Sequence, residues 1–136
     1  MVYIDSNVFV YAVTHDPARF AKANKAISIL RSVEEGETKA VTSLLAWDEL
    51  VWVVRKLGGR DAGTRAGAAL LKLENLSFSS VTPSVMMRAQ VLIERYPLKP
   101  RGSIHIATAL IMGEKEIISD DAELEIVREI RRLPLN

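Results

Sequence analysis

Residues 2–7, with the sequence VYIDSN, form a short apolar run that stops at a carboxylate. The run from Val2 to Ile4 is typical of a buried strand, and Asp5-Ser6-Asn7 is typical of the cap of a helix that follows it. A capping role alone would explain Asp5. However, a carboxylate directly after a buried strand is costly without a partner. A helix cap and a functional ligand therefore both remain open for this residue.

Outward from this run, strand-like and helix-like segments alternate along the chain. Asp16-Pro17 is expected to start the second helix, because proline is favoured at the first helical position. This alternation predicts an α/β fold with a central parallel sheet that helices cover on both faces. No linker or repeat is visible, so residues 1–136 are expected to form a single domain. Further strands are expected at residues 39–42, 76–81, 116–119 and 129–133.

The composition excludes several classes of protein. The chain has 136 residues, and its 18 basic and 17 acidic side chains give a net charge of +1, which argues against binding nucleic acid by bulk charge. It contains no cysteine, which excludes disulfides, thiolate catalysis and zinc–sulfur sites. The two histidines are too few for a histidine-rich metal site. No signal peptide and no apolar run of ~20 residues is present, so we expect a cytoplasmic protein that does not enter a membrane.

Acidic residues follow three of the expected strands. Asp5 follows the first, Asp120 and Asp121 follow the fourth, and the helix after the second carries Asp48 and Glu49. Ligands of open parallel sheets bind beyond the carboxyl ends of the strands, where these acids should meet. Carboxylates without histidine or cysteine suit Mg²⁺ or Mn²⁺, and such an ion supports hydrolysis of phosphodiesters. No P-loop, GxGxxG or GxSxG motif offers a competing site.

Each of these acids also has a structural explanation. Taken alone, Asp120 and Asp121 are better explained by a turn and a helix cap. Glu49 stands among apolar neighbours, so it either lies at a solvated edge of its helix or is held by a cation. Arg55 or Lys56 could pair with it.

Two further residues stay ambiguous. Spacing alone does not decide between Glu49 and its neighbour Asp48 as the site residue. His105 lies in an apolar, helix-like segment, where a histidine is more often a packed core or rim residue than a catalytic base.

Four segments of the chain resemble, in the same order, the four motifs of PIN-domain proteins. They are Ile4–Phe9 (IDSNVF), Thr42–Leu50 (TSLLAWDEL), Leu98–Leu110 (LKPRGSIHIATAL) and Ile117–Asp121 (IISDD), the last followed by Leu124 and Glu125. Each motif alone is weak, but four in order over nearly the whole chain are specific. The resemblance implies a three-layer PIN-like α/β domain and a ribonuclease that depends on Mg²⁺ or Mn²⁺. Many small members are VapC-type toxins that pair with an antitoxin protein.

The resemblance also assigns roles to individual residues. By the match, the catalytic acids and metal ligands would be Asp5, Glu49 and Asp121. Supporting polar positions would be Asn7, Ser43, Asp120 and Glu125. Candidate contacts to RNA phosphates are Lys99 and Arg101 beside the third motif, with Arg55, Lys56 and Arg60 past the second.

One position departs from the family pattern. The third motif usually carries an Asp after the Pro-Arg pair, but Gly102 stands there, and no acid lies between Lys99 and Ala109. Ser103 could still cap the helix, and Mg²⁺ often needs only one or two direct carboxylates. Two outcomes stay open. The chain is either a metal-dependent ribonuclease, active or impaired by Gly102, or a catalytically silent PIN-like module that binds RNA or protein.

An excess of apolar surface suggests self-association. The helix that carries Trp47 and Trp52 is apolar almost all round, which is more than one buried face requires. Val85-Met86-Met87 is a second candidate contact. We expect a homodimer, although core packing could explain both stretches.

Overall fold

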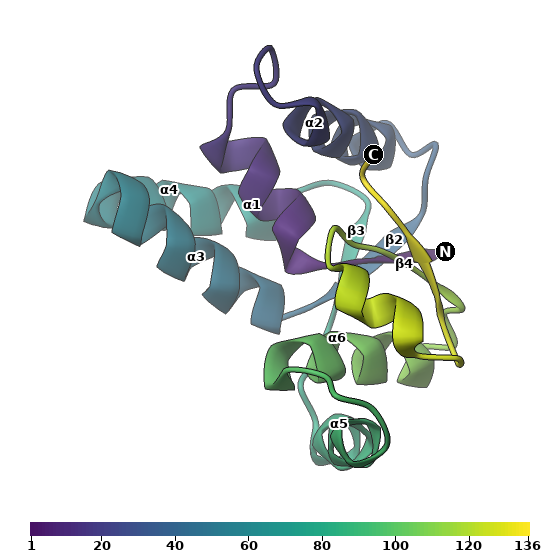
Figure 1. The fold of residues 1–136 in the computed structure, drawn as a ribbon. Coiled ribbons are helices and arrows are strands. Elements are labelled where there is room, and N and C mark those ends of the chain that lie inside the picture. The colour runs from purple at the N-terminus through teal and green to yellow at the C-terminus, as the bar shows by residue number, and fades with distance from the viewer.

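Five short strands and six α-helices alternate in the computed structural model, which describes residues 1–136. The strands are β1 (Val2–Ile4), β2 (Ala40–Ser43), β3 (Leu76–Ser79), β4 (Glu116–Ile118) and β5 (Arg131–Leu133). The helices are α1 (Ser6–Thr14), α2 (Ala21–Glu34), α3 (Leu45–Gly58), α4 (Arg60–Leu71), α5 (Pro83–Arg95) and α6 (Pro100–Ile111), with a 3₁₀-helix, η1, at Ala122–Ile126. The strands pair in the order β3-β2-β1-β4-β5, and every pair is parallel (Figure 1). The predicted α/β fold with a central parallel sheet is confirmed.

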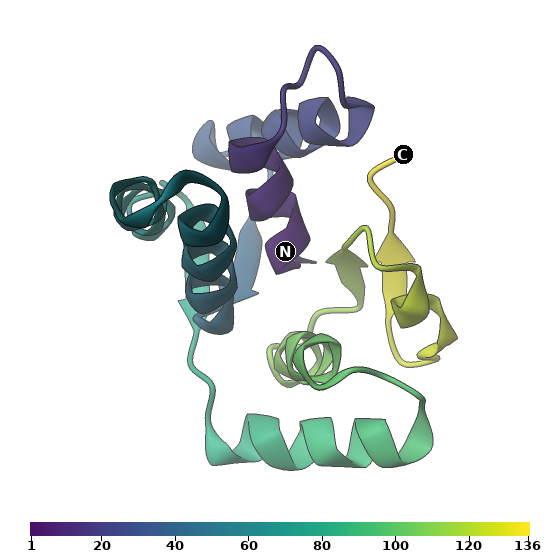
Figure 2. The same cartoon turned by 60° about the vertical axis from the view of Figure 1, so that its left-hand side comes forward.

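Helices cover both faces of this sheet. Because successive strand residues point to opposite sides, each central strand contributes side chains to two separate cores. In β1, Ile4 lies in a core formed with α1 to α4, whereas Tyr3 lies in a second core formed with α5, α6 and η1. In β4, Ile118 and Ile117 divide in the same way. Figure 2 shows α1 to α4 gathered on one side of the strands and α5 and α6 on the other. The central strands β1, β2 and β4 are therefore largely buried, as expected for a sheet that is covered on both faces, whereas the edge strand β5 carries Arg131 and Arg132.

The order of the strands marks the place for a ligand. From β1 the chain adds β2 and β3 on one side, and then returns to add β4 and β5 on the other. The strand order thus reverses between β1 and β4, and ligands of open α/β sheets bind at the carboxyl ends of such neighbouring strands. Asp5 directly follows β1 and donates its backbone N–H to the carbonyl oxygen of Ile118 at 3.0 Å.

One helix begins later than the sequence suggested. The second helix starts at Ala21 and not at Asp16-Pro17, so that prediction is wrong. The carboxylate of Asp16 accepts a hydrogen bond from the backbone N–H of Ala18 at 2.9 Å, which closes a local turn in place of a helix. Phe20 then packs edge-on against Tyr11, with ring centroids 5.2 Å apart. None of the helices combines the length and the hydropathy needed to cross a membrane.

Candidate active site

Asp5 lies at the junction of β1 and α1, and it is only 5% exposed. Its Oδ1 accepts the backbone N–H of Ser6 at 2.7 Å and so caps α1. Its Oδ2 accepts the hydroxyl of Ser119 at 2.6 Å and the side-chain amide of Asn7 at 3.4 Å. The capping role is therefore present. The same carboxylate is also held against the end of β4, where a ligand of the sheet would bind.

Glu49 meets Asp5 at a buried imidazole. His105 Nε2 lies 2.6 Å from Glu49 Oε1 and 3.5 Å from Asp5 Oδ1, and the histidine is 1% exposed. The neighbouring Asp48 is exposed. Spacing could not separate these two acids, but the packing of α3 on the sheet turns only Glu49 inward.

The expected cationic partners of Glu49 do not reach it. Neither Arg55 nor Lys56 forms an ion pair with this carboxylate, and Lys56 Nζ lies instead over the ring of Trp52, 5.5 Å from its centroid. Ser43, at the end of β2, orients the start of α3, because its Oγ accepts the backbone N–H two residues later at 3.0 Å. Glu49 is thus presented by a helix whose first turn is fixed to the end of β2.

His105 connects the two acids to the interior of the sheet. Its Nδ1 lies 2.6 Å from the hydroxyl of Tyr3, which is fully buried. Burial alone would lower the pKa of His105, but the carboxylates of Asp5 and Glu49 outweigh it and raise that pKa. Burial and the charge of Asp5 also raise the pKa of the Tyr3 phenol. The sequence correctly suggested a packed histidine but missed its contact with both acids.

The end of β4 brings the remaining acids near Asp5. The hydroxyl of Ser119 accepts the backbone N–H of Asp121 at 3.0 Å, and Asp121 Oδ1 caps η1. Asp120 is turned away, where it accepts the hydroxyl of Tyr11 at 2.6 Å and pairs with Lys22 Nζ at 2.8 Å. Burial would raise the pKa of Asp120, but its bonds to Lys22 and Tyr11 hold that pKa below 3.8. Asp121 is therefore linked to Asp5 through the hydroxyl of Ser119, whereas the carboxylate of Asp120 binds Tyr11 and Lys22 instead.

Gly102 leaves room for a side chain beside Asp121. A Cβ built at this position would lie 3.4 Å from Leu124 Cδ2 and 4.0 Å from Asp121 Oδ2, both ordinary contacts. A Cβ at this position would therefore fit, close to the carboxylate of Asp121. Ser103 does not cap the helix as expected, because α6 begins earlier, at Pro100, whose carbonyl accepts the Ser103 hydroxyl at 2.7 Å.

Other predicted residues lie around the rim. Glu125 forms an ion pair with Arg132, so its charge is largely matched. Lys99 is exposed, and its Nζ lies 4.0 Å from Glu123 Oε1. Arg101 is exposed at the start of α6. Lys99 and Arg101 thus remain available to a solvent-borne anion, whereas Glu125 is turned to a structural partner.

The donor set suits a hard cation, although it is sparse. No group of three or more acidic or histidine side chains is arranged as a ready-made metal site. Asp5 and Glu49 do converge, and neither Glu49 Oε2 nor Asp121 Oδ2 accepts a hydrogen bond from the protein. Because Mg²⁺ keeps several waters and is often bound by one or two carboxylates, these oxygens fit such an ion.

Comparison with known proteins places this geometry in a family. The family model for the PIN domain matches residues 2–130. No curated protein sequence matches the chain. A chain of VapBC2 from Rickettsia felis, solved with a DNA fragment from its promoter, has a TM-score of 0.75 at 11% identity, over 98% of both chains.

Two further solved structures are similar. A chain of FitAcB from Neisseria gonorrhoeae has a TM-score of 0.74 at 14% identity, over 99% of this chain and 98% of that one. VapC20 from Mycobacterium tuberculosis, described as a toxin that cleaves the sarcin-ricin loop, has a TM-score of 0.70 at 15% identity, over 86% of this chain and 87% of that one. Identities this low establish the shared fold alone. The family model, in contrast, spans nearly the whole chain, and the chain belongs to the PIN-domain family.

Proposed function

We propose that the chain is a metal-dependent ribonuclease of the VapC type, acting as the toxin of a toxin–antitoxin pair. The observation that carries the proposal is the meeting of Asp5 and Glu49, from separate elements, at the imidazole of His105 beyond the carboxyl ends of the strands. Asp5 also caps α1, but a cap does not require a second carboxylate, and burying the charge of Glu49 close to it is costly. The fold supports the same function, since VapC20, a structural neighbour, is described as a toxin that cleaves the sarcin-ricin loop.

The chain's own residues would divide the work as follows. Asp5, already fixed by hydrogen bonds from Ser6, Asn7 and Ser119, would hold an Mg²⁺ or Mn²⁺ ion together with Glu49, with Asp121 as the third acid. Such an ion lowers the pKa of a bound water and stabilises charge on a phosphoryl group. Glu49 Oε2, which makes no bond to the protein, would complete the shell of the ion directly or through the attacking water, which it would orient. Lys99 and Arg101 would contact the RNA backbone.

A second candidate is a silent PIN-like module that binds RNA or protein without cleaving it. The observation in its favour is Gly102, which leaves α6 without an acid opposite Asp121. The retained pair of Asp5 and Glu49 favours the ribonuclease, because capping by Asp5 does not require the charge of Glu49 beside it.

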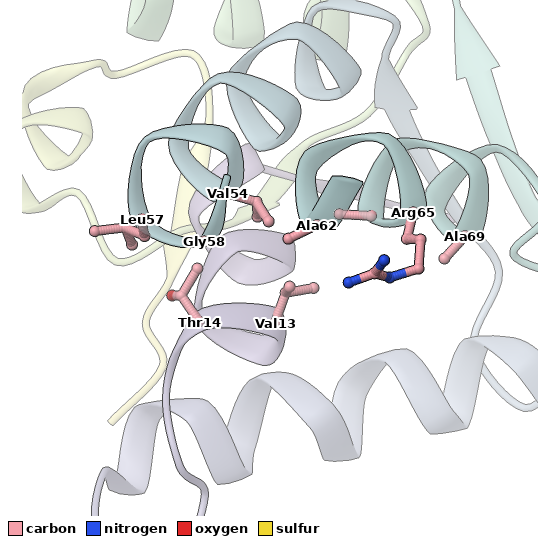
Figure 3. Close-up of a pocket in the computed structure, with 9 residues that line it drawn as sticks. Val13, Thr14, Val54, Leu57, Gly58, Ala62, Arg65 and Ala69 are labelled. Atoms are coloured by element: carbon pink, nitrogen blue, oxygen red, sulfur yellow. The ribbon is translucent and has the colours of Figure 1, made fainter. Parts of the chain in front are cut away.

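An apolar groove offers a place for the antitoxin. It has a volume of about 480 Å³ and lies between the end of α1 and the pair α3 and α4 (Figure 3). Val13, Val54, Leu57 and Ala69 contribute apolar surface, and the guanidinium of Arg65 extends into it. Helices commonly bind in such grooves through an apolar face. One structural neighbour, from Klebsiella pneumoniae, was solved as a toxin–antitoxin complex, and another, from Salmonella typhimurium, was solved as VapBC bound to DNA.

Exposed apolar side chains support the expected homodimer. Trp47 and Trp52 on α3 are 40% and 54% exposed, and Met86 and Met87 on α5 are 46% and 70% exposed. Large exposed apolar side chains of this kind mark an interface where they gather into a patch. Sedimentation velocity of the purified chain decides this point, because a monomer at micromolar concentration would contradict the dimer.

Thermal unfolding with added Mn²⁺ or Mg²⁺ tests the metal site without a guess about the RNA. Saturation at a hundred times the dissociation constant should stabilise the fold by about 2.7 kcal/mol. We expect this gain in the free energy of unfolding for the native chain and not for Asp5→Asn. Cleavage of a mixed pool of structured RNAs, with Asp5→Asn as the control, then tests the activity. No metal-dependent rise together with no cleavage would favour the silent module.

A further inference from the structure

We propose that His105 is a positioning residue: the hydroxyl of Tyr3 sets the orientation of its ring, and the ring holds the Glu49 carboxylate beside Asp5. The proposal rests on the proposed function in one respect, namely that Glu49 is a ligand of the ion. It extends that function by assigning a role to a residue outside the set of acids. His105 does not contact RNA in this role and acts only through Glu49.

Counting donors and acceptors fixes which nitrogen carries the proton. An ionised carboxylate only accepts hydrogen bonds, so the 2.6 Å contact between His105 Nε2 and Glu49 Oε1 requires a proton on Nε2. Nδ1 meets the hydroxyl of Tyr3 at 2.6 Å, accepting from it in the neutral ring and donating to it in the protonated ring, so Nε2 keeps its proton in either state. The Tyr3 hydroxyl thus fixes the ring in the orientation that Glu49 needs. A hydrophobic residue at position 105 could fill the space but could not make either bond.

The two acids depend on this ring to different extents. Asp5 is held by Ser6, Asn7 and Ser119 whether or not His105 is present. Glu49, in contrast, forms no other hydrogen bond or ion pair with the protein. Its Oε1 is fixed by His105, while its Oε2 stays free for a ligand. Loss of the imidazole should therefore release Glu49 and leave Asp5 in place.

Binding of Mn²⁺, measured by titration calorimetry on the full chain, provides the main test. Residues that orient a metal ligand typically change affinity by about 10–100-fold. We expect His105→Leu to weaken Mn²⁺ binding by this amount and His105→Gln to retain most of it, because the glutamine amide can still donate near the position of Nε2. Tyr3→Phe should also weaken binding. Tyr96→Phe is the matched control, since it removes a hydroxyl that bonds Glu129 at 2.7 Å, away from Asp5 and Glu49.

A double-mutant cycle separates positioning from a structural effect. If His105 acts through Glu49, His105→Leu should cause no further loss of Mn²⁺ affinity in a Glu49→Gln background. An additive loss would show that His105 acts by a route other than Glu49, and would overturn the proposal. Equal affinities of the native chain and His105→Leu, or tighter binding by His105→Leu, would overturn it as well.

A spectroscopic readout does not depend on the metal. Long-range ¹H–¹⁵N spectra of the imidazole at neutral pH should show a protonated Nε2 in the native chain, and Tyr3→Phe should shift the Nδ1 resonance. An unprotonated Nε2 would refute the arrangement. If neither the native chain nor Gly102→Asp binds Mn²⁺, the proposed metal site fails, and the role of His105 fails with it. If the native chain or Gly102→Asp binds Mn²⁺ and the corresponding His105 variant binds it equally well, only the inference about His105 fails.

Discussion

Gly102→Asp is the substitution that tests most directly the absence of a third-motif acid at position 102. The backbone at Gly102 needs no left-handed conformation, and a Cβ would make only ordinary contacts with Leu124 and Asp121. The new side chain should therefore fit without repacking. Its carboxylate would lie close to that of Asp121, since the Cβ is already 4.0 Å from Asp121 Oδ2. The variant adds charge to the site while changing its shape very little.

The expected magnitude follows from the repulsion between these two carboxylates. Two like charges ~5 Å apart repel by roughly 3 kcal/mol at an effective dielectric constant of about 20. Because Asp121 is partly open to solvent, we expect Gly102→Asp to lower the free energy of unfolding by only about 1–2 kcal/mol without a metal. Added Mn²⁺ should reverse this loss, since the ion screens the pair. Each tenfold gain in Mn²⁺ affinity corresponds to about 1.4 kcal/mol.

Chemical denaturation with and without Mn²⁺, beside cleavage of RNA, provides the assay. Gly102→Asn is the matched control, because it has nearly the same size and shape without the charge. Gly102→Asp should be less stable than Gly102→Asn without metal, more strongly stabilised by Mn²⁺, and faster in RNA cleavage than the native chain. Identical behaviour of the two variants in all three measurements would refute the idea that position 102 lies beside a metal site.

Three smaller perturbations test the packing around the site. Gly67→Ala should destabilise the fold by about 1–3 kcal/mol in urea denaturation, because a Cβ there would lie 2.6 Å from Trp47 Nε1, where α3 and α4 meet. Ser119→Ala should cost about 1–3 kcal/mol in the same measurement, since it removes a buried hydroxyl that takes part in three hydrogen bonds; no change would contradict its role as a link between strand ends. Asp120→Asn should be less stable than the native chain at pH 7. Since the bond to Lys22 lowers the folded-state pKa of Asp120 below 3.8, this difference should fade as the pH falls below about 4, and a difference that is constant with pH would refute the ion pair.

Much of the fold could be predicted from the sequence, because its signals are local. Apolar runs between helical segments indicated the five strands, and the observed strands overlap all of the expected ones. The start of α2 could not be found in this way. Asp16-Pro17 has the residues of a helix start, but the Asp16 side chain closes a turn with Ala18, and the packing of Phe20 on Tyr11 completes the turn. Propensity alone does not distinguish a helix that begins from a turn that ends.

The candidate site shows the opposite balance, because its geometry depends on contacts between distant segments. Asp48 and Glu49 are adjacent on α3, and only the docking of that helix on the sheet decides which one faces Asp5. His105 could have been anticipated in part. It follows Gly102 by three residues in a helix, so the two positions share one face of α6. The sequence could not show that the Tyr3 hydroxyl would contact Nδ1 of His105 while Nε2 of the same ring contacts Glu49.

Capping and ligand roles are compatible for the same carboxylate, because each carboxylate has two oxygens. Asp5 uses Oδ1 to cap α1 and so fixes the direction of Oδ2, which the hydroxyl of Ser119 holds at the end of β4. Asp121 uses Oδ1 to cap η1 and leaves Oδ2 facing the place of the missing side chain at Gly102. A capping hydrogen bond to one carboxylate oxygen therefore also fixes the direction of the other oxygen, and no further residue is needed for this. For this reason a capping role for an acid at a strand end is no evidence against a functional one, and substitutions such as Asp5→Asn, which keep the cap oxygen while removing the charge, separate the two roles.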